Sequence, residues 1–257
     1  MSTYLEELFG LTGLTAVVTG GSSGIGRAMA GALGRAGARI VLVARRPGPL
    51  AETAEELAAA GVRVGTVVAD LADRAALTAA TARIVSEYGD PDVLVNAAAV
   101  NRRPPMDELT DDDWDVTLAA NLTAPFLLGQ RFGPAMAARG RGRIINVVSQ
   151  QAFRAYGNSG AYGVAKAGLV ALTRSQAEAW SGRGVCCNAV APGVVHTPLT
   201  EPVFADPEKV AAHARRTMIG RNGVPADFAG CAVYLASSAS AAVTGQTLFV
   251  DGGYSAT

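Results

Sequence analysis

Seven short runs of apolar and β-branched residues alternate with longer helical stretches along this chain, and this alternation restricts its fold more than any other feature. The runs cover residues 15–20, 38–44, 62–69, 92–97, 142–149, 184–191 and 247–253. They are almost continuously apolar, as strands covered on both faces must be. Between them, stretches rich in Ala and Leu have helical spacing, the clearest at 50–60, 74–88, 111–138, 160–180 and 226–236. The pattern predicts an α/β fold: a doubly wound, parallel, seven-stranded sheet with helices on both faces.

Length and composition favour a single domain over residues 1–257. The chain is 49% apolar and 17% charged, which suits a large core, and no linker or repeat divides it. Residues 198–224 break the alternation with several prolines and scattered charges. We expect this segment to be an insertion over the edge of the sheet that serves as a substrate lid.

Charge, targeting and cysteine features argue against several functions. The net charge is zero and no run of like charges occurs, so neither nucleic acid nor a membrane surface is expected as a partner. The N-terminus lacks the features of a signal peptide, and no segment approaches the roughly 18 apolar residues of a membrane span. Cys186, Cys187 and Cys231 fit neither a disulfide framework nor a zinc site, and His196 and His213 fit no metal site. We expect a soluble, cytoplasmic protein without a metal, with both histidines at the surface or in the lid.

A glycine-rich turn, TGGSSGIG at residues 19–26, follows the first predicted strand and opens a helix. A strand that turns into a helix N-terminus presents unpaired N–H groups and the positive end of the dipole, which suits a pyrophosphate. The spacing G-x-x-x-G-x-G differs from the usual dinucleotide fingerprint, but the turn lies at the first βα junction, where parallel sheets bind ligands. We predict a dinucleotide site formed by Gly20, Ser22, Ser23, Gly24, Ile25 and Gly26.

The end of the second predicted strand indicates which dinucleotide is bound. An NAD site would place an acidic residue there for the ribose hydroxyls, but this strand ends in Ala44-Arg45-Arg46. A guanidinium pairs well with a 2′-phosphate. NADP(H) is therefore the preferred cofactor, with NAD(H) as the alternative if the two arginines only solvate a loop.

Tyr162 and Lys166 lie four residues apart on a predicted helix, so their side chains share one face. Lys166 is one of two lysines in a chain with twenty arginines. A free phenol has a pKa near 10 and is a poor base at neutral pH, but a nearby ammonium favours the phenolate. The compact ammonium of Lys also reaches ribose hydroxyls in a space that the planar guanidinium of Arg would not fit.

With these features together, the sequence resembles the short-chain dehydrogenase/reductase family over about residues 11–253. Further family motifs are matched by Ser149, by Asn121 in WDVTLAANLTAPF, by APGVVHTP at 191–198 and by GQTLFVDGG at 245–253. The resemblance implies a Rossmann-type fold and hydride transfer between a nicotinamide and a CH–OH group. It implies that Tyr162 is the general acid/base and that Lys166 lowers its pKa and holds the nicotinamide ribose. Ser149 would bond the substrate oxygen, and Asn121 would support a water chain to Lys166.

The same resemblance implies further cofactor contacts and an assembly. The contacts are at Asp70, Leu71, Asn96, Ala97, Ala98, Pro192, Gly193, Val195 and Thr197. A homotetramer is implied, assembled partly through the two long helices and the C-terminal strand. One motif departs from the family, because Ala99 stands where Asn-Asn-Ala-Gly ends in glycine, and its methyl group would lie beside the adenosine.

Two segments that follow strands bear on the substrate, VNRRPP at 100–105 and SQQAF at 149–153. They look like those of gluconate 5-dehydrogenases and related sugar-acid dehydrogenases. Arg102 or Arg103 would clamp a carboxylate, and Gln150 or Gln151 would bond sugar hydroxyls, unless the arginines only form an exposed basic loop. We expect an NADP(H)-dependent oxidoreductase of a secondary alcohol or ketone, with a gluconate or 5-ketogluconate type of polyol acid as the specific substrate. The alternatives are a 3-oxoacyl-thioester or generic ketone reductase and a nucleotide sensor without catalysis.

Overall fold

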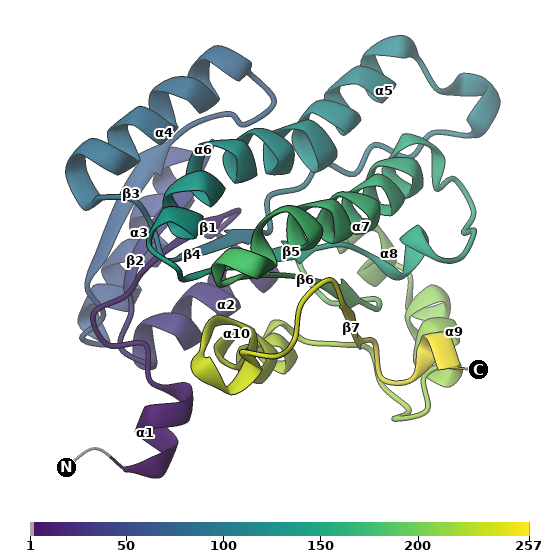
Figure 1. The fold of residues 1–257 in the computed structure, drawn as a ribbon. Coiled ribbons are helices and arrows are strands. Elements are labelled where there is room, and N and C mark those ends of the chain that lie inside the picture. The colour runs from purple at the N-terminus through teal and green to yellow at the C-terminus, as the bar shows by residue number, and fades with distance from the viewer. Residues whose placement is uncertain (1–2, 257) are drawn as a thin grey trace.

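The computed structural model describes residues 3–256, which contain one sheet of seven parallel strands in the order β3-β2-β1-β4-β5-β6-β7 (Figure 1). The strands are β1 (Thr15–Thr19), β2 (Arg39–Ala44), β3 (Val64–Val68), β4 (Val93–Asn96), β5 (Gly142–Val147), β6 (Val185–Pro192) and β7 (Thr247–Val250). Each strand lies inside a predicted run, except that β6 extends one residue beyond its run, and this confirms the predicted fold class. The order reverses between β1 and β4, and such a switch point opens a crevice at the carboxyl ends of the strands.

Helices cover both faces of the sheet. They are α1 (Tyr4–Phe9), α2 (Gly24–Arg35), α3 (Pro47–Ala59), α4 (Arg74–Tyr88), α5 (Asp111–Leu118), α6 (Ala124–Ala138), α7 (Gly160–Trp180), α8 (Glu201–Phe204), α9 (Pro207–Arg216) and α10 (Ala229–Ala236). In Figure 1, α4, α6 and α7 lie on one face and α2 and α10 on the other.

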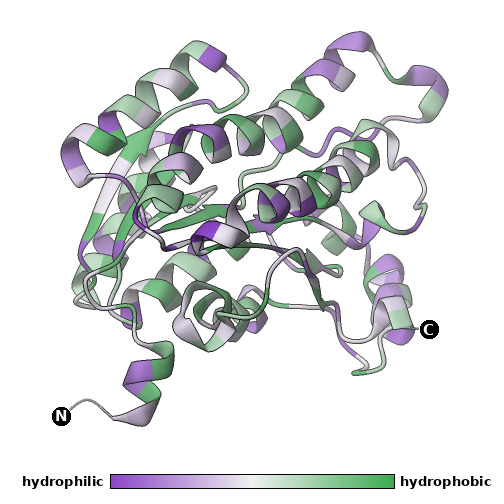
Figure 2. Ribbon diagram, viewed as in Figure 1, coloured by the Kyte–Doolittle hydropathy of each residue, from purple (hydrophilic) through white to green (hydrophobic). Residues whose placement is uncertain are grey.

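A large apolar core lies on each face of the sheet, and a smaller third cluster includes Val148 and Leu169. Val18 of β1 packs in the core that includes Met29 of α2, whereas the adjacent Val17 packs in the core that includes Phe132 of α6. Neighbouring strand residues therefore serve opposite faces, which is why the strands are almost continuously apolar. Figure 2 shows the hydrophobic colour along the strands and the hydrophilic colour gathered on outer parts such as α9.

The helix predicted at 111–138 is interrupted in the structure. Residues Ala119–Thr123 form a π-helical turn between α5 and α6. Asn121 lies in this turn, and its amide Nδ2 donates to the carbonyl of Val100 at 2.8 Å while its Oδ1 accepts from the N–H of Val100 at 3.1 Å. Single π-helical turns occur mostly at functional sites. This turn joins the segment after β4 to the layer of helices through Asn121. The helical periodicity of the sequence did not predict the turn.

The segment predicted as an insertion, 198–224, carries α8 and α9 outside the sheet (Figure 1). Its two ends are held together, because Gly223 donates its N–H to the carbonyl of Val194 at 2.9 Å and accepts from the N–H of His196 at 3.2 Å. The segment therefore leaves and rejoins the body of the protein at one place. Of the helices within residues 3–256, none has the length and apolar character of a membrane span.

Candidate active site

A cavity of about 940 Å³ runs along the carboxyl ends of the strands. We name its two ends by their residues. The glycine-loop end comprises the lining residues of 20–26, 43–46 and 69–72, and the tyrosine end comprises those of 101–103, 149–162 and 198–213. The volume is near the upper limit of ordinary small-molecule pockets, so it accommodates a large ligand or two ligands together.

The glycine-loop end is formed largely by main-chain atoms. Gly20 and Gly24 have φ of 67° and 53°, a left-handed conformation that L side chains rarely adopt. Ser23, the N-cap of α2, makes no side-chain capping bond, so the N–H groups of the first helical turn remain directed at the cavity. This arrangement fits the pyrophosphate of a dinucleotide.

Close contacts between loops leave no room for side chains in this cradle. A Cβ on Gly20 would lie 2.8 Å from the backbone of Ala97 and Ala98, and one on Gly24 would lie 3.0 Å from the side chain of Thr197. Sequence reasoning overlooked Thr19, whose Oγ1 accepts from the N–H groups of Ala97 and Ala98 at 3.1 Å each. Thr19 thus holds the loop after β4 against the glycine turn.

Ala99 lines the cavity where the family commonly has glycine. Its φ is not positive, since Asn158 alone among the non-glycine residues of 3–256 has a positive φ. The position therefore needs no glycine for its conformation here. The departure adds a methyl group to the wall and leaves the backbone unstrained.

Arg45 and Arg46 lie at the exposed end of β2, on the glycine-loop end of the cavity. No hydrogen bond or ion pair holds either guanidinium within the part of the chain that the structure describes. Asp70 and Leu71, which follow β3, line the same end. Two unpaired guanidinium groups beside the cavity fit an anionic group such as a 2′-phosphate. The sequence predicts the same, because this strand ends in arginines and not in a carboxylate.

The tyrosine end contains the predicted catalytic residues. Tyr162 and Lys166 lie on α7 and are buried, with exposed fractions of 7% and 2%. The Lys166 Nζ lies 5.7 Å from the centroid of the Tyr162 ring and donates to the carbonyl of Val147 at 2.8 Å. Ser149, just after β5, forms the N-cap of a short helical turn and also lines the cavity.

Burial dominates the ionisation of this pair. Desolvation raises the pKa of Tyr162 to about 12, and a hydrogen bond with Ser149 and the charge of Arg103 act in the opposite direction. Desolvation lowers the pKa of Lys166 to about 7. Both shifts disfavour the charged form in a medium of low dielectric. The family resemblance implies that Lys166 lowers the pKa of Tyr162. In the protein without a ligand, the groups that lower this pKa against the effect of burial are Ser149 and Arg103.

Most of the positions predicted from the sequence line the cavity. They are Gly20, Ser22, Ser23, Gly24, Ile25, Gly26, Arg45, Arg46, Asp70, Leu71, Ala97, Ala98, Arg103, Ser149, Gln150, Gln151, Tyr162, Lys166, Pro192, Gly193, Val195 and Thr197. Three others do not line it: Asn96, Arg102 and Asn121. The Nδ2 of Asn96 donates to Asn146 inside the core at 2.8 Å, and the amide of Asn121 is bonded to Val100.

The two neighbouring arginines face in different directions. Arg102 pairs with Asp112 at 2.6 Å and with Asp113 at 3.1 Å, on the outside of the cavity. Arg103 lines the cavity, and its Nε donates to the carbonyl of Asn158 at 2.9 Å. Its Nη2 also donates to the carbonyl of Gly157. Both of these partners are neutral carbonyls, so within the described part of the chain no carboxylate neutralises the charge of Arg103.

The two adjacent glutamines also differ. Gln150 is 3% exposed, and its Oε1 has no hydrogen-bond partner among residues 3–256. The Oε1 of Gln151 accepts from the hydroxyl of Ser159 at 2.9 Å. A buried acceptor without a partner is costly, so Gln150 is suited to a ligand that donates a hydrogen bond.

Sequence reasoning did not assign several lining residues of the tyrosine end to the site. They are Asn101, Tyr156, Gly157 and Asn158, and from the lid segment Pro198, Leu199, Thr200, Pro202, Val203, Lys209 and His213. The placement of 100–105 beside the active site had anticipated Asn101, and the lid prediction had anticipated the residues of 198–213. No local motif marks these residues, because they reach the cavity from segments that are distant in the sequence.

Comparison with known proteins places the chain among dehydrogenases. The family model described as enoyl-(acyl carrier protein) reductase matches residues 20–255. The gluconate 5-dehydrogenase of Gluconobacter oxydans is 38% identical over 247 residues, 96% of each chain. The D-threitol dehydrogenase of Mycolicibacterium smegmatis is 41% identical over 253 residues, 96% of this chain and 94% of that one. The crystal structure of a gluconate 5-dehydrogenase from Burkholderia cenocepacia in complex with NADP and tartrate has a TM-score of 0.94 and 35% identity, covering 99% of this chain and 100% of that chain.

Proposed function

This chain belongs to the short-chain dehydrogenase/reductase family, and we propose that it interconverts the alcohol and ketone forms of a polyol acid, of the gluconate and 5-ketogluconate type, with NADP(H). Membership of the family makes it an oxidoreductase that acts on CH–OH groups. The substrate, the cofactor preference and the roles of individual residues are the proposal.

The charge distribution of the cavity is the observation that carries the proposed substrate. Asp70 is the sole carboxylate among the described residues that line the cavity, and it lies at the glycine-loop end. The tyrosine end presents Arg103, His213 and Lys209, of which Lys209 is paired with Asp206 at 3.0 Å. Burial and the positive charges of Arg216 and Arg103 lower the pKa of His213. Because the lowered pKa leaves His213 uncharged near neutral pH, Arg103 supplies the unpaired positive charge of this end, and it favours an anion beside the reacting alcohol.

Arg103 is the residue that we assign to the substrate carboxylate. Its guanidinium lies at the cavity wall and is oriented by two main-chain carbonyls. A guanidinium pairs with a carboxylate through parallel hydrogen bonds, which gives direction as well as affinity. Gln150 adds an unpaired acceptor for a sugar hydroxyl.

Three residues carry the proposed proton chemistry. Tyr162 holds the proton that passes to the substrate oxygen during reduction and receives it during oxidation. Ser149 bonds the same oxygen, and Lys166 in its charged form stabilises the phenolate. Asn121 acts indirectly, by holding the Val100 segment that leads to Arg103. The nicotinamide supplies or accepts the hydride when it is bound.

The glycine-loop end supports NADP(H). The N–H groups at the start of α2 fit the pyrophosphate, and Arg45 and Arg46 would hold the 2′-phosphate. The relative from Burkholderia cenocepacia was crystallised with NADP. We also propose that 198–224 acts as the substrate lid, since α8 and α9 supply lining residues to the tyrosine end.

A homotetramer is proposed from the exposed apolar side chains. Phe126 on α6, Val164 on α7 and Phe249 on β7 are 42%, 49% and 38% exposed. Large exposed apolar groups on long helices and on an edge strand favour association. Light scattering coupled to size exclusion would measure the assembly, and a monomer would overturn this proposal.

The proposed function is tested by assaying both directions with NADP(H) and NAD(H) against a panel of substrates. The panel contains gluconate and 5-ketogluconate, the neutral polyol D-threitol, simple ketones and a 3-oxoacyl thioester. We expect the highest kcat/KM for the sugar acid with NADP(H). A higher value for the neutral polyol or the thioester would replace the proposed substrate. No turnover of any compound would favour a nucleotide sensor.

A further inference from the structure

Two distant segments of the chain, the 153–159 loop and α9, meet around the ring of Tyr254, which is 2% exposed. The Tyr156 ring stacks on it with centroids 6.0 Å apart, and the His213 ring approaches to 6.4 Å. The guanidinium of Arg216 lies over the same ring at 4.4 Å. Tyr156 and His213 both line the tyrosine end of the cavity. Tyr254 therefore lies behind two residues of the proposed substrate site.

The C-terminal turn that carries Tyr254 is well determined by its sequence. Gly252 and Gly253 have φ of 65° and 82°, which allow the chain to reverse directly after β7. The carboxylate of Asp251 accepts from the N–H groups of Gly253 at 3.0 Å and Ser255 at 2.8 Å. The guanidinium of Arg154 donates to the carbonyl of Ser255 at 2.6 Å. The turn is thus tied to the loop that contains Tyr156.

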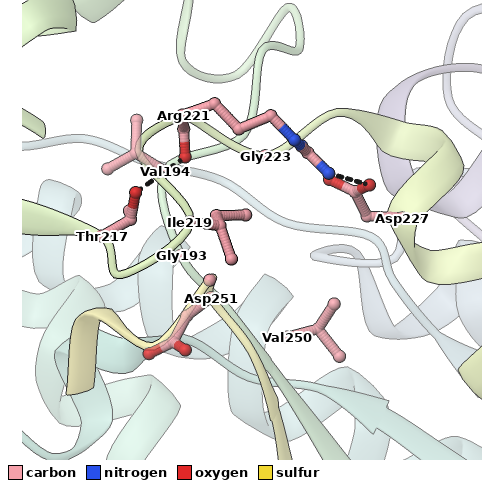
Figure 3. Close-up of a pocket in the computed structure, with 10 residues that line it drawn as sticks. Gly193, Val194, Thr217, Ile219, Arg221, Gly223, Asp227, Val250 and Asp251 are labelled. Atoms are coloured by element: carbon pink, nitrogen blue, oxygen red, sulfur yellow. Dashed lines mark hydrogen bonds and ion pairs between the residues drawn. The ribbon is translucent and has the colours of Figure 1, made fainter. Parts of the chain in front are cut away.

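The base of the lid rests on the same turn. The N–H of Ile219 donates to the carbonyl of Gly252 at 3.3 Å, and a Cβ on Gly252 would lie 2.7 Å from the Ile219 side chain. Figure 3 shows Ile219 beside Asp251 in a second cavity of about 90 Å³, with the ion pair of Arg221 and Asp227 at its far side. The C-terminal turn of residues 251–255 therefore contacts α9 through Tyr254 and the base of the lid through Gly252.

We propose that Tyr254 is a positioning residue that holds α9 over the tyrosine end of the cavity through its contacts with His213, Arg216 and Tyr156. The ring contacts both α9 and the 153–159 loop. When it is removed, α9 loses an aromatic contact and a cation–π contact at once. The consequence for substrate affinity rests on the proposed function, whereas the consequence for the position of α9 does not.

The test compares Tyr254→Ala, Tyr254→Phe and Tyr88→Ala with the parent protein. The control removes another packed tyrosine ring, since a Cβ on Gly65 would lie within 2.6 Å of Tyr88 at the far edge of the sheet. Hydrogen–deuterium exchange is measured for the peptides of 205–222. KM and kcat are measured for 5-ketogluconate, and the Kd of NADPH by its fluorescence.

We expect Tyr254→Ala to speed exchange in α9 and to raise KM, each by about tenfold, and to leave the Kd of NADPH within about twofold. Tyr254→Phe keeps the ring but loses the hydroxyl that hydrogen-bonds with Tyr156, so its exchange in α9 should stay closer to the parent than to Tyr254→Ala. Tyr88→Ala should lower the melting temperature without faster exchange in α9. Parent-like exchange in α9 of Tyr254→Ala would overturn the proposal, even if no substrate were found.

A second pair of variants covers the case in which Tyr254→Ala fails to fold. Arg216 and Arg215 are adjacent and exposed, but only Arg216 lies over the Tyr254 ring. Arg216→Ala should speed exchange in α9 by about threefold, the range of an exposed cation–π contact, whereas Arg215→Ala should not. Equal exchange in these two variants would count against the proposal.

Discussion

The phosphate cradle of the glycine-loop end is built from the main chain of one βα turn, whereas the tyrosine end is built from side chains of several distant segments. At the first end, positive φ angles and N–H groups form a cradle in which Gly20 and Gly24 leave no room for side chains. At the second end, Arg103, Gln150 and His213 arrive from three separate parts of the chain. Their polar groups depend on neighbours in space for their direction.

The contrast has a physical meaning for specificity. A phosphate binds to main-chain groups that every sequence possesses, so the first end requires little beyond the correct backbone. Discrimination between substrates requires particular side chains that are desolvated and oriented. Changes at the tyrosine end should therefore alter substrate preference, and changes at the glycine-loop end should alter cofactor affinity. The variants below separate the two.

The largest effect is expected at Tyr162, in the tyrosine end. Tyr162→Phe removes the phenolic proton and should lower kcat by about 10³-fold, within the range of general acid–base catalysis. The Kd of NADPH, measured by fluorescence, should change little. Turnover equal to the parent would contradict the proposed role of Tyr162.

The lowered pKa of Lys166 should make the free energy of unfolding depend on pH. Its pKa falls from about 10.4 in the unfolded chain to about 7 in the folded one, so the unfolded chain binds more protons between these values. The contribution of Lys166 to stability is full above the higher pKa and is lost as the pH falls to 7. Relative to Lys166→Met, the parent should gain several kcal/mol of unfolding free energy from pH 7 to 10. Parallel curves in urea unfolding without cofactor would refute the burial effect.

Arg103 and Arg102 form a matched pair for the substrate. Arg103→Ala should raise KM for 5-ketogluconate by about 10- to 100-fold, the strength of a charged hydrogen bond. The KM for D-threitol should change far less, because it has no carboxylate. Arg102→Ala should leave both values close to those of the parent, since its partners lie outside the cavity. Equal effects of the two substitutions would remove the proposed carboxylate site.

Arg45 and Arg46 test the glycine-loop end alone. Replacing both with alanine should raise KM for NADP by about tenfold, because an exposed guanidinium–phosphate contact is weakened by solvent. KM for NAD and for the sugar acid should stay as they are. Steady-state kinetics with each cofactor measures this, and a similar loss for NAD and NADP would show that the arginines do not recognise the 2′-phosphate.

The smallest effect concerns the two adjacent glutamines. Gln150→Leu removes a buried acceptor without a partner and should stabilise the protein by about 1 kcal/mol while it raises KM severalfold. Gln151→Leu removes the acceptor of the Ser159 hydroxyl and should destabilise the protein. Thermal unfolding measures both, and a loss of stability in Gln150→Leu would indicate that its amide is needed by the fold.

Features that depend on neighbouring residues could be predicted well. The seven strands, the glycine turn and the pair Tyr162 and Lys166 each follow from residue types at fixed short spacing, since strand period, turn conformation and helix period are local. The two arginines that follow β2 are also a local feature that the sequence shows directly. These features determined the fold and one end of the cavity.

Features that depend on long-range contacts emerged only from the folded chain. Adjacent residues in a loop have no period that says which one faces inward, so Arg103 and Arg102 looked alike until Asp112 and Asp113 were seen to hold Arg102 outside. Asn121 was expected to support a water chain to Lys166, and its bond to Val100 from a π-helical turn emerged only in the folded chain. Tyr254 had no motif at all, because its partners lie in α9 and in the 153–159 loop. Local spacing determines which chemistry the chain contains, and packing between distant segments decides which side chains reach the substrate.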